Sequence, residues 1–275
     1  MDASAAAVAA YVLHSRSYRE SGAIVDFLTR DHGRIALFAH GVAPSAKGRR
    51  RRAGIGALLQ PFTAVLVGWR GPLDGGQLQA IENAGPPLVL PPHRVMSGFY
   101  LNELLLKLLH REDPHPEVFD AYHGALLALA AASARDEPAR LAEARALRRF
   151  EYALLESLGL CADFAHESGG GAPVEPTGRY QLRRSTGLVA VAGSMPGFSG
   201  AHLLSLVEGR LDDEAALLTA RAVLRELLDA ALDGRPLLTR RVARSVAGLM
   251  AATPPVATGI VPDPAGAADP DAVSG

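Results

Sequence analysis

Residues Ala9–Gly41, AAYVLHSRSYRESGAIVDFLTRDHGRIALFAHG, decide the fold of the first part of the chain. Three strand-like runs in this segment are separated by RESG and RDHG, whose glycines suit turns that need a positive φ. Two more runs of the same kind follow, LLQPFTAVLVGW (58–69) and GQLQAIENA (76–84). Five strands in residues 1–84 are too few for a sandwich, but they suit a small closed barrel, which leaves no exposed edge.

A proline-rich segment, GPPLVLPPH (Gly85–His93), follows the barrel and disfavours both a helix interior and a strand ladder. Beyond it the apolar residues recur with a helical period, which predicts helices at 93–111, 115–132 and 137–160. The later part of the chain predicts a hairpin at 179–193 and two more helices at 212–233 and 236–250.

These patterns predict an α+β multidomain protein, with a five-stranded barrel first and an α-helical domain after it. The expected parts are the barrel (1–84), a proline-rich linker (85–92), the helical domain (93–164), a hairpin region (165–200), C-terminal helices that pack on the helical domain (201–251) and a disordered tail (252–275). The tail is rich in Pro, Ala, Gly and Asp, a composition typical of disorder.

Charge is unevenly divided along this chain, whose net charge is only −1. Residues 1–70 carry ten Lys and Arg against four Asp and Glu, so this part has a charge of +6 and the remainder −7. Five of the cations lie in one glycine-flanked loop, at Lys47 and Arg49–Arg52. Such asymmetry indicates a polyanion as the partner of the first part.

The basic loop has three interpretations: a solvated loop without a partner, a targeting signal, or a phosphate-contacting surface. We favour the last, because arginine pairs bidentately with phosphate oxygens and small barrels bind single strands in cationic grooves. Tyr18, Phe38, Phe62 and Trp69 are available for base stacking, but we expect most of them in the barrel core. Backbone contacts should then dominate, with weak sequence preference and strong salt dependence.

The motifs of most enzyme classes are missing from the sequence. GVAPSAKG (Gly41–Gly48) lacks the second glycine and the hydroxyl of a phosphate-binding loop, and the histidines follow no metal-binding spacing.

The single cysteine, Cys161, excludes an internal disulfide and fits a reducing compartment. The start of the chain lacks the features of a signal peptide, and no apolar run is long enough to span a bilayer. We therefore expect a cytoplasmic protein that is not an enzyme and has no cofactor.

Several segments together resemble the RecO family of bacterial recombination mediators. They are VLHSRSYRESGAIVDFLTRDHGRIALFAHG, LLQPFT, FYLNELLLKLLHREDPHPEVFDAYHGALLAL, LRRFEYALLESLGL, YQLRRSTGLVAV and GRPLLTRR, in the order found in the family. The likeness covers most of residues 8–245. It implies an OB-type barrel, and a non-enzymatic protein that binds single- and double-stranded DNA and anneals complementary strands. It also implies that the protein engages the acidic, apolar-ended tail of the single-stranded-DNA-binding protein and, with RecR, promotes RecA loading.

Many members of this family carry a four-cysteine zinc module after the LLESLG helix, and this chain cannot. Its one cysteine excludes such a site, so the resemblance implies a degenerate, zinc-module-like hairpin region without metal. Two other functions stay open from the residues: an OB-type RNA-binding or translation-associated protein, and a nuclease or NTPase acting on nucleic acid.

The resemblance also implies where two binding sites lie. DNA would bind the basic residues of the barrel, which are Arg34, Lys47, Arg49, Arg50, Arg51 and Arg52, with Arg16 and Arg70 as further candidates. The partner's tail would bind the helical domain where a cation and an apolar pocket occur together, at Arg148, Arg149, Phe99 and Tyr100. For these two arginines, ordinary surface ion pairs with nearby glutamates are the alternative.

Overall fold

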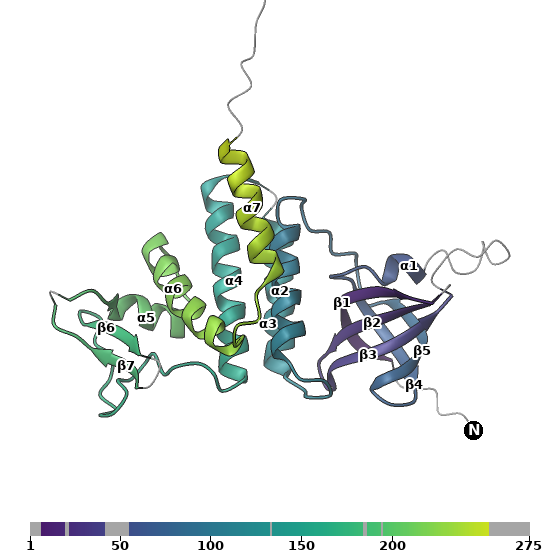
Figure 1. The fold of residues 1–275 in the computed structure, drawn as a ribbon, viewed down its shortest axis with the longest axis horizontal. Helices are drawn as coiled ribbons and strands as arrows, with labels where there is room; N and C mark the ends of the chain where they lie inside the picture. Colours follow the sequence, from purple (N-terminus) through teal and green to yellow (C-terminus); the bar gives the residue numbers. More distant parts are fainter. Residues whose placement is uncertain are drawn as a thin grey trace, which may run out of the picture.

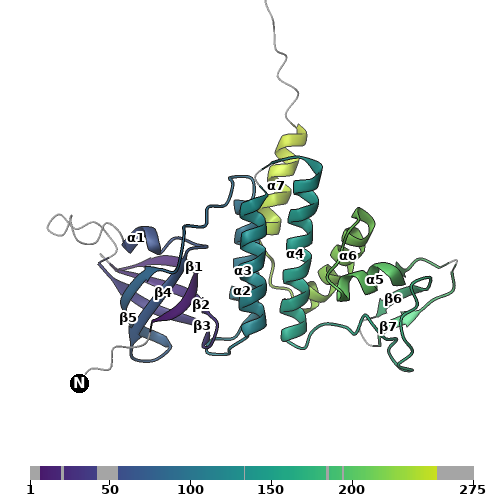
Figure 2. The same cartoon turned by 180° about the vertical axis from the view of Figure 1, so that it is seen from behind.

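A computed structural model of the chain describes residues 7–19, 22–41, 55–132, 134–183, 186–193 and 195–252, with side chains described as far as 245. The molecule is elongated (Figure 1). A barrel lies at one end, four long helices lie in the middle, and a small sheet with two further helices lies at the other end. Figure 2 shows the same order from behind, with the barrel and the small sheet at opposite ends.

The N-terminal part is the closed five-stranded barrel predicted from the sequence. Its strands are β1 (Val8–Tyr18), β2 (Gly22–Thr29), β3 (Gly33–His40), β4 (Ala64–Arg70) and β5 (Asp74–Asn83). They are ordered β1-β2-β3-β5-β4, with β4 paired to β1, and only the β3–β5 pair is parallel. The strand predicted from residue 58 begins at Ala64, because a short helix, α1 (Ile55–Leu58), and a turn precede it.

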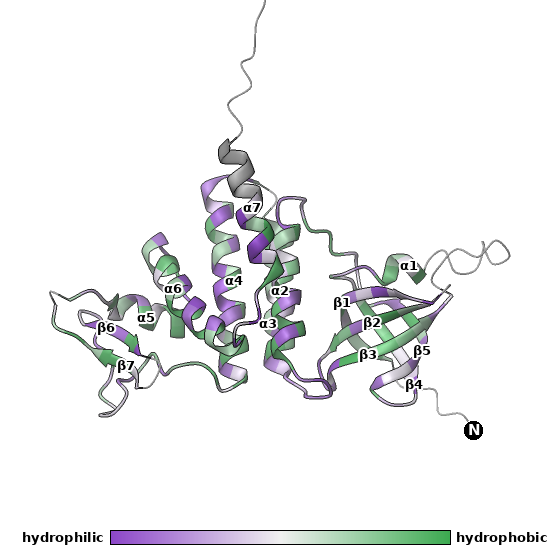
Figure 3. Cartoon of the chain, viewed as in Figure 1, coloured by the Kyte–Doolittle hydropathy of each residue, from purple (hydrophilic) through white to green (hydrophobic). Residues whose placement is uncertain are grey.

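The barrel encloses its own apolar core. Alternate residues of the strands point inward and are fully buried, among them Val12, Val25, Phe27, Leu37 and Val67. In Figure 3 these strands are largely hydrophobic, with hydrophilic positions in between. The two-residue period read from the sequence is the period of this core.

The helical part begins with three long helices, all at predicted places. They are α2 (Val95–Leu108), α3 (Pro116–Ala131) and α4 (Glu137–Ser157). After the hairpin region follow α5 (Gly200–Val207), which the sequence did not predict, and then α6 (Glu214–Ala231) and α7 (Leu238–Ala252). No helix in the described part of the chain is both long and apolar enough to cross a membrane.

Aspartate caps set the start of the two long helices α4 and α6. The Asp136 carboxylate accepts a hydrogen bond from Ala139 N (3.1 Å), and the Asp213 carboxylate accepts one from Ala216 N (2.7 Å). Each satisfies a backbone N–H that the first helical turn leaves without a partner. The acids that border these helices in the sequence are therefore structural.

The barrel and the helices share a second apolar core. Tyr11, Leu13, Leu28 and Phe62 belong to the barrel part of the chain, yet they are buried together with residues of α2, α3 and α4. Leu90 of the proline-rich segment is buried in the same cluster. The segment is thus packed against both parts, and the barrel is held on the helices by apolar burial as well as by polar contacts.

Backbone contacts also lock β3 to the loop between α2 and α3. Arg34 forms a β-bridge with Arg111, and Glu112 N donates to Arg34 O (3.0 Å). Gly33 has φ +64°, and a Cβ atom at this position would overlap the carbonyl group of Asp113. Glycine is therefore required here twice, for its backbone conformation and for the close approach.

Near the same junction, ion pairs and hydrogen bonds join side chains of the two parts. Arg30 pairs with Asp120 of α3 (2.7 Å), and Arg111 pairs with Asp26 and Asp74 of the barrel. The buried Asn102 amide donates to Leu13 O (2.7 Å). These contacts specify one orientation of the barrel on the helices.

The hairpin region is a three-stranded sheet, β7-β6-β8, formed by β6 (Arg179–Arg183), β7 (Gly187–Ala190) and β8 (Phe198–Ser199). The buried Tyr180 hydroxyl accepts a hydrogen bond from Glu175 N (2.8 Å), and the Asp163 carboxylate accepts from Ala165 N (2.8 Å). Within the described residues, no group of three or more His, Cys, Asp and Glu side chains is placed to hold a metal. In the described part of this region, hydrogen bonds and apolar packing hold the sheet together.

Candidate nucleic-acid and partner-binding sites

The predicted DNA-binding residues divide into three groups. Arg16 on β1 and Arg70 at the end of β4 are exposed on the outer surface of the barrel. The basic loop, with Lys47, Arg49, Arg50, Arg51 and Arg52, lies outside the described residues. For both groups, a role in DNA binding stays a prediction.

Arg34 lies on β3 in the barrel, as predicted, but its side chain is in the junction between the barrel and the helices. Its guanidinium donates to Leu106 O at the C-terminal part of α2 (2.6 Å), and its Nε atom is buried without a hydrogen-bond partner in the structure. Burial lowers the pKa of Arg34 from its ordinary value, with Asp26 acting in the opposite direction. Arg34 therefore contributes to the attachment of the barrel, and we remove it from the DNA surface.

The expectation that most of the four aromatic residues lie in the barrel core is wrong. Of these residues, Trp69 alone packs against that core, whereas Phe62 is buried in the core shared with the helices. Tyr18 is exposed and Phe38 is half-buried, and their rings contact each other on the outside of the barrel.

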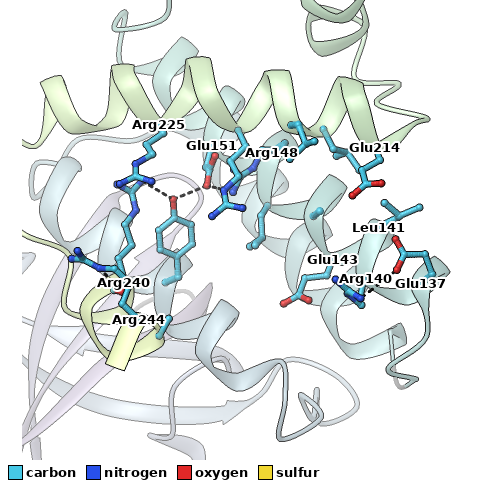
Figure 4. A pocket seen from close by; sticks show the side chains of 17 residues that line it. Glu137, Arg140, Leu141, Glu143, Arg148, Glu151, Glu214, Arg225, Arg240 and Arg244 are labelled. Carbon is cyan, nitrogen blue, oxygen red and sulfur yellow. Dashed lines mark hydrogen bonds and ion pairs between the residues drawn. The ribbon is translucent and has the colours of Figure 1, made fainter. Parts of the chain in front are cut away.

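A cavity of about 640 Å³ lies between α4, α6 and the start of α7. Its lining combines six arginines, four glutamates and a set of apolar side chains. The arginines are Arg140, Arg148, Arg221, Arg225, Arg240 and Arg244. Figure 4 shows Arg225, Arg240 and Arg244 at one end of the cavity and Arg140 among glutamates at the other. The end formed by Arg225, Arg240 and Arg244 is therefore the cationic end of the cavity.

Apolar side chains line the cavity from α4 and α6, chiefly Leu141, Leu147, Leu217 and Leu218. Leu218 is exposed to solvent, although a leucine of an amphipathic helix is usually buried. A cavity that offers leucines beside arginines suits a peptide that ends in an apolar residue next to carboxylates.

A buried ionic network forms the floor of the cavity (Figure 4). Glu151 is almost completely buried and accepts hydrogen bonds from the Tyr100 hydroxyl (2.6 Å) and from Arg148 (2.6 Å). Burial raises the pKa of Glu151, while Arg148 and Tyr100 act in the opposite direction. Arg240 of α7 donates to the Tyr100 hydroxyl (3.3 Å) and thereby ties α7 to this network.

Two of the four residues predicted for the partner's tail meet at this cavity, and two do not. Tyr100 and Arg148 line it. Phe99 faces the barrel, where its ring packs edge-on against Phe62 (5.1 Å between centroids). Arg149 donates to Gly209 O (2.6 Å) and lines a different, smaller hollow between α3 and α4. Phe99 and Arg149 therefore lie outside the candidate tail site.

The cations contributed by α6 and α7 were missed in the sequence. Arg221 and Arg225 are four residues apart on α6, and Arg240 and Arg244 are four apart on α7. This spacing places each pair on one helix face, which is a signal that the sequence does contain. The convergence of the two pairs on α4 depends on tertiary packing.

Glu103 of α2 holds the N-terminal end of α7 in place. Its carboxylate accepts hydrogen bonds from Leu238 N (2.7 Å), Thr239 N (2.9 Å) and the Thr239 hydroxyl (2.7 Å), and it also pairs with Lys107 (3.3 Å). Burial alone would raise the pKa of Glu103. The hydrogen bonds from Thr239, Leu238 and Lys107 have the larger combined effect and bring this pKa below its ordinary value. Glu103 thus caps the helix that supplies Arg240 and Arg244 to the cavity.

Replacement of Glu103 by glutamine should lower the free energy of unfolding by about 1–2 kcal/mol at pH 7. Because the folded-state pKa lies below the unfolded value, the carboxylate's contribution is complete above the unfolded pKa and disappears as the pH falls through the folded one. The difference in stability between the wild type and Glu103→Gln should therefore shrink as the pH falls through the folded-state pKa of Glu103. Denaturant titrations at several pH values measure it.

The matched control for this prediction is Glu82→Gln, which changes an exposed glutamate on β5. Its stability should follow the wild type at every pH. A gap between wild type and Glu103→Gln that persisted at low pH would contradict the capping role of the ionised carboxylate.

Both parts of the chain match family models, and most of its length matches known proteins. A family model described as "Recombination protein O N terminal" matches residues 4–86, and one described as "Recombination protein O C terminal" matches residues 91–241. A DNA repair protein RecO of Pseudomonas aeruginosa is 41% identical over 240 residues, which cover 86% of this chain and 94% of that protein. A DNA repair protein RecO of Thiobacillus denitrificans is 39% identical over 243 residues, which cover 87% and 91%.

Proposed function

This chain belongs to the RecO family of DNA repair proteins, and from this membership we propose that it is a non-enzymatic mediator of recombination. In this role it binds single- and double-stranded DNA, anneals complementary strands, and engages the tail of the single-stranded-DNA-binding protein. Together with RecR it then promotes the loading of RecA. The role belongs to the cytoplasm, at the nucleoid.

The observation that carries this proposal is the separation of two cationic sites. Arg16 and Arg70 are exposed on the barrel, whereas the arginine end of the cavity lies on the far side of α2, between α4, α6 and α7. A chain with one DNA surface and one separate site for an acidic peptide can hold a DNA strand and a strand-coating protein at the same time.

The mechanism is electrostatic and geometric. Cations on the barrel neutralise phosphates, so that two strands approach each other with less repulsion. In the cavity, the arginines of α6 and α7 would pair with the carboxylates of the partner's tail, and the leucines would bury its apolar end. No step in this mechanism requires a covalent bond to be formed or broken.

The DNA part of the proposal predicts a change in salt dependence. Replacement of Lys47 and Arg49–Arg52 by glutamine should make the plot of log K against log salt concentration less steep on single strands. The slope should fall in magnitude by about 3 to 4, because each lost phosphate contact contributes about 0.7. Strand annealing should be lost at physiological ionic strength, while binding of an acidic tail peptide is retained. Fluorescence anisotropy over a salt series measures the first effect, and annealing of labelled oligonucleotides the second.

The tail part is tested by the converse variant, Arg221→Glu combined with Arg225→Glu. Both residues are exposed at the cavity, so the change should leave folding intact and weaken tail-peptide binding about tenfold or more. Arg148→Glu is less suitable, because it would place a second carboxylate beside the buried Glu151. The control is Arg210→Glu, at an exposed arginine outside the cavity. If the loop variant and the cavity variant each lost both activities while remaining folded, the two-site model would be wrong.

A further inference from the structure

One row of side chains around the outside of the barrel has an arginine at each end and an aromatic ring between them. Along this row Arg16 on β1 pairs with Ile24 on β2, and Ile24 with Phe38 on β3. Phe38 pairs with Gln77 on β5, and Gln77 with Arg70 on β4. Paired residues of neighbouring strands point to the same face of a sheet, so these five side chains, here called the outer row, form a continuous band.

Tyr18 widens the aromatic part of the outer row. It belongs to the next row, where it pairs with Gly22, and this glycine leaves the space above β2 without a side chain. The Tyr18 ring packs on the Phe38 ring, with centroids 5.4 Å apart and planes inclined by 52°. The Arg19 guanidinium lies 5.2 Å from the centroid of the Tyr18 ring. Tyr18, Phe38 and Arg19 thus form one aromatic–cationic platform.

The helical part of the protein contacts the barrel beside the outer row. The adjacent row contains Asp26 and Asp74, and both pair with Arg111 of the loop between α2 and α3. Two residues further along β2 and β3, the outer row is accessible: Arg16, Gln77 and Arg70 are exposed, and so are Tyr18 and Arg19. Arg111 therefore neutralises Asp26 and Asp74 at the junction. The exposed side chains named in and beside the outer row are cationic, amide or aromatic.

We propose that the Tyr18–Phe38–Arg19 platform stacks an unpaired nucleobase of single-stranded DNA, while Arg16 and Arg70 contact phosphates on either side. The proposal rests on the proposed DNA-binding function and assigns the barrel a second mode of binding beyond phosphate neutralisation. Strands lie about 4.8 Å apart, so Phe38 is two strand spacings, roughly 10 Å, from each of the flanking arginines. A single strand that crosses the barrel strands can thus place phosphates at both ends and a base in the middle.

The chemistry of the platform favours a single nucleic-acid strand over other anionic partners. An acidic peptide would satisfy the arginines but offers no regular series of planar groups to the rings. Duplex DNA would satisfy the arginines too, but its bases are already stacked on one another and paired. Unlike these two partners, an unpaired strand presents a series of phosphates and free π-faces together.

The proposal is tested by comparing three DNA ligands by fluorescence anisotropy. They are a single-stranded oligonucleotide, a strand of equal length in which the central nucleotides are abasic, and a duplex. The wild type should bind the base-bearing strand about tenfold more tightly than the abasic strand, since stacking on one aromatic platform is worth this order of affinity. Tyr18→Leu, which keeps an apolar contact with Phe38 but has no ring, should remove this preference and leave duplex binding unchanged.

Two variants keep this test specific. Tyr18→Phe retains the ring and should retain the preference for the base-bearing strand. Phe99→Leu is the matched control, because Phe99 has nearly the same exposed fraction as Tyr18 (39% and 38%) and also packs against a phenylalanine, but lies on α2 away from the outer row. Its binding to all three ligands should equal that of the wild type.

Each result then separates the platform from the proposed function. If the wild type binds the abasic and base-bearing strands equally, the stacking platform is wrong while DNA binding stands. If the wild type binds none of the three ligands, the proposed function fails, and the platform with it. Loss of the preference in Tyr18→Phe, or an equal loss of single-strand and duplex binding in a folded Tyr18→Leu, also overturns the platform.

Discussion

Gly33→Ala is expected to lower the free energy of unfolding by about 2–5 kcal/mol and to loosen the barrel from the helices. The backbone at this position is left-handed, which costs an L-residue about 1–2 kcal/mol. The new Cβ atom would also overlap the backbone of Asp113, and overpacking against backbone costs about 1–3 kcal/mol more. Both effects act on the contact that joins β3 to the loop after α2.

Gly159→Ala is the matched control for this prediction. Gly159 has nearly the same backbone conformation, with φ +67° against +64° at Gly33, but a Cβ atom there would meet no other atom within 4 Å. The free energy of unfolding of Gly159→Ala should therefore fall only by the cost of the left-handed backbone, about 1–2 kcal/mol. Denaturant unfolding of both variants measures the difference. Equal losses would mean that the close approach at Gly33 does not contribute to stability.

The second large effect is expected from Glu151→Ala, with a loss of about 3–5 kcal/mol. Glu151 is 1% exposed, and its removal leaves the Arg148 guanidinium, whose side chain is only 12% exposed, without a counter-charge. The Tyr100 hydroxyl loses its acceptor as well. A buried ion that has lost its partner accounts for most of the predicted cost.

The double variant Glu151→Leu with Arg148→Met decides whether the unpaired charge is the cause. It removes both charges and fills the space with apolar side chains, an exchange that is often neutral in protein interiors. Most of the stability lost in Glu151→Ala should therefore return, as measured by denaturant unfolding. A double variant as unstable as Glu151→Ala would show that the unpaired charge of Arg148 is not the cause of the loss.

The sequence predicted the barrel and the long helices because their signals are local. The short apolar runs that contain Val12, Val25 and Leu37, and the glycines of the turns between them, are properties of short segments. The start of β4 was misplaced because the apolar run LLQPF resembles a strand, whereas its Phe62 has a positive φ (72°) and packs into the core shared with the helices. The octapeptide of α5 is too short for a helical period to stand out.

The roles of single residues depended on tertiary packing and were harder to predict. Arg34 reads as a surface cation of a strand, and only the approach of α2 to the barrel makes it a junction residue. The continuous apolar run around Tyr11 and Leu13 did carry a signal, because a strand with both faces apolar is covered on both sides. The cavity joins α4 with α6 and α7, which follow only after the hairpin region and α5, and no local pattern predicts such a convergence.

The apolar outer side of the barrel has a practical consequence for anyone who wishes to use the barrel as a portable nucleic-acid module. Cutting the chain after β5 would uncover Tyr11, Leu13, Leu28 and Phe62, which the helices bury. An isolated fragment with this exposed patch would self-associate and precipitate before its ligand affinity could be judged. Excision therefore calls for polar substitutions at these positions, and a failed truncation would carry no information about what the barrel binds.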